Sequence, residues 1–110
     1  MGLFNHFNEE KDLHNEYQGK HKAEVSHELL SGAAAFAAAH EYEKWCEKNG
    51  KPQNHAKAKE LLAGFAGAFI DHEVESRGLD FIDKQKAKKH AKERAENRYT
   101  EVVEVNNYQK

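Results

Sequence analysis

The sequence predicts an all-α protein, a small helical bundle built on an antiparallel hairpin of two related helices, and three observations support this. Fifteen of the 110 residues are alanine, the best helix former. The strongest breaks in the chain, at Gly19, around Pro52 and at Gly78, separate segments of helical length. Strand-forming residues gather only in one valine cluster near the C-terminus. We therefore expect residues 1–110 to form a single helical domain.

The two central segments carry the clearest helical patterns. Residues 26–48 begin with Ser26, a residue type that caps helices, and Glu28 follows where a negative charge favours the helix dipole. Residues 54–77 end before Gly78, which is the usual form of a helix C-terminus. Apolar residues recur in both at steps of three and four and so share one face. The predicted core consists of Leu29, Phe36, Leu61, Leu62, Phe65, Phe69, Ile70 and Tyr99.

Both central segments contain the same motif. Residues 28–43 align without gaps with residues 60–75, at an offset of 32, and eight of the sixteen positions are identical. Two copies are too few for a repeat array, so a helix duplicated inside a bundle is the better explanation. Because only a short connection around Pro52 joins the two helices, we expect them to lie antiparallel.

Two outer helices complete the predicted bundle. A short N-terminal helix over residues 9–20 is polar, with Leu13 and Tyr17 as its anchors. A long C-terminal helix begins at Asp80 as its candidate cap, and its charge run is interpreted as a solvated face. Residues 1–8 are expected to form an N-terminal arm, and residues 102–110 form a tail that is a candidate for disorder.

The overall composition excludes several classes of protein. The 17 basic and 19 acidic residues give a formal net charge of −2, whereas binding to nucleic acid needs a cationic surplus. Cys46 is the single cysteine, so no internal disulfide can form. The longest apolar stretches fall well short of a membrane span, and no signal peptide is recognisable. We expect no transmembrane segment and a location in the reducing cytoplasm.

Histidine is the conspicuous excess in this chain, but it forms no recognised site. The eight histidines are scattered without the spacing of metal ligands, and no catalytic motif is present, so we expect neither an enzyme nor a bound cofactor. In an antiparallel hairpin His27 would lie near the end of the helix that carries His72 and Glu73. Binding of a metal or a haem is therefore kept as an alternative function, with His27, His40, His72 and Glu73 as its candidate residues.

Small residues in the second central segment indicate a close helix contact. Gly64 and Ala68 are four positions apart, as are Ala63 and Gly67, and this spacing lets another backbone approach. Tight packing inside the bundle is the simplest explanation. The functional alternatives are a homodimer or another protein contact through Gly64, Gly67 and Ala68, and peripheral binding to a lipid surface through the alanine- and glycine-rich helices.

Three stretches of the chain carry a family resemblance. They are residues 26–36 (SHELLSGAAAF), residues 55–68 (HAKAKELLAGFAGA) and residues 77–91 (RGLDFIDKQKAKKHA). In order and spacing they resemble the fungal CipC-like antibiotic-response proteins. The resemblance implies a small intracellular fungal protein of the antibiotic and stress response, whose biochemical activity is unknown and whose family offers no established site residues. We therefore expect it to act by protein–protein contact or self-association.

Overall fold

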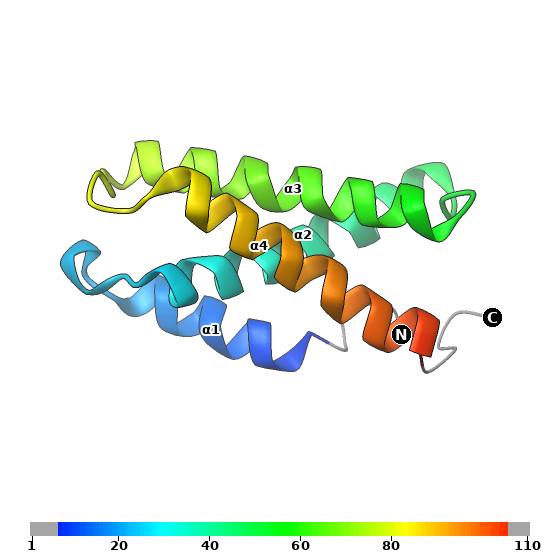
Figure 1. Cartoon of the computed structure of the whole chain (residues 1–110), viewed down its shortest axis with the longest axis horizontal. Helices are drawn as coiled ribbons and strands as arrows, with labels where there is room; N and C mark the ends of the chain where they lie inside the picture. The colour runs from blue at the N-terminus through cyan, green and yellow to red at the C-terminus, as the bar shows by residue number, and fades with distance from the viewer. Residues whose placement is uncertain (1–6, 106–110) are drawn as a thin grey trace.

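Four α-helices run up and down along one long axis in the computed structural model, which describes residues 7–105 and the side chains of residues 7–103 (Figure 1). They are α1 (Asn8–Gly19), α2 (His27–Asn49), α3 (His55–Ser76) and α4 (Lys84–Tyr99). A 3₁₀ turn, η2 (Lys22–Glu24), joins α1 to α2, and a π-helical turn, η3 (Thr100–Val105), follows α4. The predicted all-α bundle, with its antiparallel hairpin, short N-terminal helix and long C-terminal helix, is confirmed.

Side-chain caps define where the helices begin. Ser26 accepts a hydrogen bond from the backbone N–H of the third residue beyond it at 3.1 Å, and Asn54 accepts the equivalent bond at 2.8 Å. The predicted cap of α4 at Asp80 is wrong, because the cap is Asp83, which accepts from its own third neighbour at 3.1 Å. The start is delayed because Leu79 is fully buried and ties the α3–α4 loop to the core.

The alanine excess is explained by the position of α2 in the bundle. This helix packs against α1, α3 and α4, so water reaches little of its first half. Seven consecutive residues, 29–35, are buried, as is the alanine pair at 38 and 39. Small side chains let three neighbouring helices approach one central helix. On α4, the side chains that point toward α2 and α3 are also mostly small, and Ala87, Ala91, Ala95 and Tyr99 are buried.

At Gly32, α1 comes close to the backbone of α2. A Cβ atom at Gly32 would lie 2.8 Å from the Cβ of Leu13, which is closer than two carbon atoms can pack. The absence of a side chain at Gly32 therefore lets the short N-terminal helix sit directly on the α2 backbone.

The predicted core is only partly correct. Leu29, Leu62, Ile70 and Tyr99 are buried, but Leu61, Phe65, Phe69 and Phe36 are partly exposed and pack against the edge of the core. The face of α3 that points inward carries Leu62, Ala66 and Ile70. Each of these residues directly follows a residue of the predicted face, which carries Leu61, Phe65 and Phe69. The fully buried large side chains outside the predicted set are Phe7, Tyr17, Leu30, Tyr42 and Leu79.

The C-terminal tail is more ordered than expected. The turn η3 continues from α4 to Val105, and Val102 and Val103 are buried. The expectation of disorder from residue 102 is therefore wrong as far as residue 105, and residues 106–110 lie outside the described part of the chain. In the N-terminal arm, Phe7 is buried, and residues 1–6 lie outside the described part.

Candidate functional site

A groove of about 460 Å³ opens on the outer face of the α2–α3 hairpin, beside α1. Phe36 from α2 and Phe65 and Phe69 from α3 form its apolar walls, and all three are partly exposed. Concave apolar surfaces of this size are typical of binding sites. We call this hollow the aromatic groove. Its lining residues are His14, Phe36, Ala37, His40, Glu41, Phe65, Ala68, Phe69 and His72.

Helix α1 contributes a wall of the aromatic groove through ring contacts. The centroid of the His14 ring lies 5.0 Å from that of Phe36 and 6.3 Å from that of Phe69. Tyr17 meets the edge of Phe69 with a centroid distance of 6.3 Å. Since both phenylalanines belong to the hairpin, the groove exists in this form only while α1 is docked.

Two ionisable groups at the α1 wall have shifted pKa values. Burial lowers the pKa of His14, with Glu73 acting in the opposite direction and His40 in the same direction. The Tyr17 hydroxyl donates to Oε1 of Glu73 at 2.6 Å, and burial together with this bond raises the pKa of Tyr17 to about 12. The guanidinium of Arg77 lies over the Tyr17 ring, 4.5 Å from its centroid.

The residues predicted as candidates for a metal or a haem are not brought together. His40 and His72 line the aromatic groove, and Nδ1 of His72 lies 3.2 Å from Oε2 of Glu73. His27 lines a separate hollow, where its Nε2 accepts a hydrogen bond from the backbone N–H of Asp83 at 3.1 Å. Within residues 7–105, no group of three or more histidine, cysteine or acidic side chains is arranged to hold a metal ion.

The residues predicted for self-association face in two directions. Gly64 and Ala68 are exposed on α3, and a Cβ atom at Gly64 would meet nothing within 4 Å. Gly67 is buried instead, because the Cε atoms of Lys88 and Lys92 would lie 3.5 and 3.3 Å from a Cβ placed there. Gly67 therefore serves the packing of α4 on α3, whereas Gly64 and Ala68 remain open to a partner.

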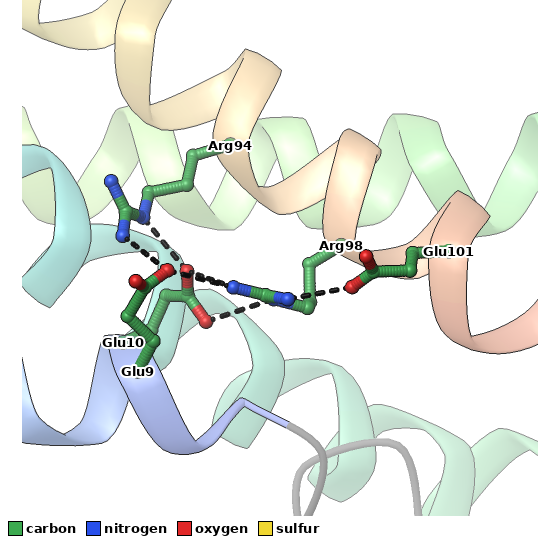
Figure 2. Close-up of polar contacts among 5 residues, drawn as sticks. All are labelled: Glu9, Glu10, Arg94, Arg98 and Glu101. Carbon is green, nitrogen blue, oxygen red and sulfur yellow. Dashed lines mark hydrogen bonds and ion pairs between the residues drawn. The ribbon is translucent and has the colours of Figure 1, made fainter.

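A cluster of ion pairs joins α1 to α4 on the other side of the bundle (Figure 2). The Glu10 side chain is 1% exposed and accepts from Nε of Arg94 at 2.8 Å and from Nε of Arg98 at 3.1 Å. Glu9, which is 66% exposed, binds the same two arginines, and Glu101 accepts from Arg98 at 2.6 Å. We call these five residues the ion cluster.

Neither His14 nor the ion cluster was predicted from the sequence. His14 and Tyr17 are three positions apart, a spacing that places both on one helical face, but the polar composition of this helix obscured the signal. Arg94 belongs to the charge run that was interpreted as a solvated face, and Arg98 was not singled out. Their spacing of four was visible, whereas the burial of Glu10 depends on a helix more than 80 positions away.

Comparison with known proteins gives one match. A family model described as virulence factor CipC-like matches residues 10–102 of the chain. The chain belongs to the CipC-like family. This match runs from Glu10 in α1 to Val102 in the first half of η3, so the four packed helices together are the CipC-like domain. No curated protein and no solved structure matches the chain. None of the helices of residues 7–105 has the length and apolar character needed to cross a membrane.

Proposed function

We propose that this CipC-like protein is a non-catalytic cytoplasmic protein of the antibiotic and stress response that acts by self-association. The partner is a second copy of the chain, seated on the aromatic groove. The observation that carries this proposal is the partial exposure of Phe36, Phe65 and Phe69 side by side on one face of the hairpin.

The duplicated motif makes the aromatic groove suited to a copy of itself. The two helices carry the same motif, and the 32-residue offset pairs lining residues on the two sides of the groove. At two of these pairs a large side chain on one helix corresponds to a small one on the other. Such alternation of knobs and hollows is self-complementary, as a two-fold dimer requires. The pairs are Phe36 with Ala68, Ala37 with Phe69, and His40 with His72.

The open backbone of α3 beside the groove supports the same proposal. Gly64 and Ala68 continue the apolar surface along the helix, and nothing in the described part of the chain covers Gly64. A second helix can therefore approach α3 closely there. Gly67 has no part in this contact because the stems of two lysines cover it.

Sedimentation velocity over a range of protein concentrations tests the dimer. We expect the weight-average mass to rise from monomer toward dimer, and the variant Ala68→Arg to keep the protein monomeric by placing a charge in the groove. Ala56→Arg is the matched control, since Ala56 is also an exposed alanine of α3 but does not line the groove. A strict monomer at high concentration, or equal effects of the two variants, would contradict the proposal.

The family description and the cysteine support the proposed stress-response role and cytoplasmic location. The matching family carries the description virulence factor, and the single cysteine, Cys46, is free and partly buried, as suits a reducing compartment. We expect the amount of this protein in its native cells to rise after exposure to an antibiotic, as measured by quantitative mass spectrometry. An unchanged amount would remove the response role while leaving self-association intact.

A further inference from the structure

We propose that a second hollow, between the start of α2 and the inner edge of α4, binds the phosphate group of a small molecule. This hollow has a volume of about 340 Å³ and lies apart from the aromatic groove. We call it the basic pocket. Its lining residues are His27, Glu28, Ser31, Lys86, His90 and Arg94.

Three side chains of α4 line the basic pocket in a regular row. Lys86, His90 and Arg94 follow one another at intervals of four, so they share one face of the helix. Opposite them, the hydroxyl of Ser31 is buried and donates to the backbone carbonyl of Ala87 at 3.4 Å. This contact joins α2 to α4 beside the pocket.

The hydrogen-bonding capacity of the basic pocket consists mainly of donors. Nε2 of His27 accepts a hydrogen bond from a backbone N–H, so in the neutral ring the proton is on Nδ1. The Nδ1–H group is therefore a donor for a ligand. Within residues 7–105, the side chains of Lys86 and His90 have no hydrogen bond or ion pair. Arg94 binds the two carboxylates of the ion cluster through Nε and Nη2, while its Nη1 points away from them (Figure 2).

These donors suit a phosphate better than they suit an apolar ligand or a cation. A phosphate presents several strong acceptor oxygens in a tetrahedral arrangement, which donors on two facing helices can surround. Glu28 is the single carboxylate among the lining residues of the pocket. Its negative charge weakens the binding of an anion. Lys86 offers a phosphate a charge-assisted bond, whereas the charge of Arg94 is already paired with Glu9 and Glu10.

Binding of phosphate to the intact chain tests this inference directly. We expect inorganic phosphate and glycerol 3-phosphate to bind saturably, with glycerol as the uncharged control, in a titration followed by the backbone amide signals of residues 27–31 and 86–94 in NMR spectra. Lys86→Ala should weaken binding about tenfold, the value expected for one charge-assisted hydrogen bond. Glu28→Gln should strengthen it, because the opposing charge is removed.

Lys89→Ala is the matched control, because Lys89 is an exposed lysine of the same helix that lines a different hollow. It should leave binding unchanged within about twofold. All three substitutions are at exposed positions, so the fold is expected to persist. Absence of saturable binding, or equal losses in Lys86→Ala and Lys89→Ala, would overturn the inference. The outcome is independent of the dimer, which uses the outer face of the hairpin.

Discussion

Replacing Glu10 by glutamine is expected to lower the free energy of unfolding by about 3–5 kcal/mol, the cost of removing one partner from a buried ion pair. The Glu10 side chain is 1% exposed and receives hydrogen bonds from both Arg94 and Arg98. These bonds raise the pKa of Arg98, against the opposing effect of its partial burial. Without the carboxylate, two guanidinium groups are left facing each other with only exposed acids to balance them. Urea denaturation followed by circular dichroism measures the loss.

Glu9→Gln provides the control for this experiment within the same cluster. Glu9 lies 3.0 Å from Arg94 and 2.9 Å from Arg98, so it binds the same two arginines, but it is 66% exposed. Solvent screening limits such a pair to about 1 kcal/mol or less. If the two variants lost equal stability, burial of Glu10 would not be what gives the ion cluster its strength.

Leu62→Ala is expected to cost about 2–5 kcal/mol, and Phe65→Ala only about 1–2 kcal/mol, although phenylalanine is the larger residue. Leu62 is completely buried between the helices, so its truncation leaves a cavity. Phe65 borders the aromatic groove and already meets water on one side. Thermal and chemical denaturation of the two variants at low protein concentration measures both values without a contribution from self-association.

A larger loss for Phe65→Ala than for Leu62→Ala would contradict this assignment of the inward face of α3. It would also argue against the dimer, since a phenylalanine needed for the core is not available to a partner. The two substitutions therefore test the inward face of α3 and the proposed dimer surface together.

The sequence predicted the helices well because their signals are local. Ser26 and the glycine at 78 act within a few residues of their own positions, and the alanine-rich composition favours a helix in any context. The duplicated motif also predicted the hairpin, because two similar helices joined by a short loop have few ways to pack. Asp80 failed as a cap because Leu79 beside it is buried by residues distant in the chain.

The candidate site was predicted less well, because the exposure of a side chain depends on which of two neighbouring helix faces packs against the core. On α3, Phe65 and Leu62 lie on adjacent apolar faces, and the pattern alone does not say which one points inward. His40 and His72 were identified as noteworthy, but the groove that they share includes His14 from a helix outside the repeat. Contacts between residues more than 20 positions apart produce no periodic pattern in a single sequence.

The enclosure of α2 on three sides has a consequence for how the chain is made. On the ribosome α1 emerges first and can cover one side of α2, but α3 and α4 are synthesised later. Until α4 has emerged, the buried run at residues 29–35 is exposed to water and to other nascent chains. Emergence of the C-terminal helix is thus expected to be the step that completes the burial of this run.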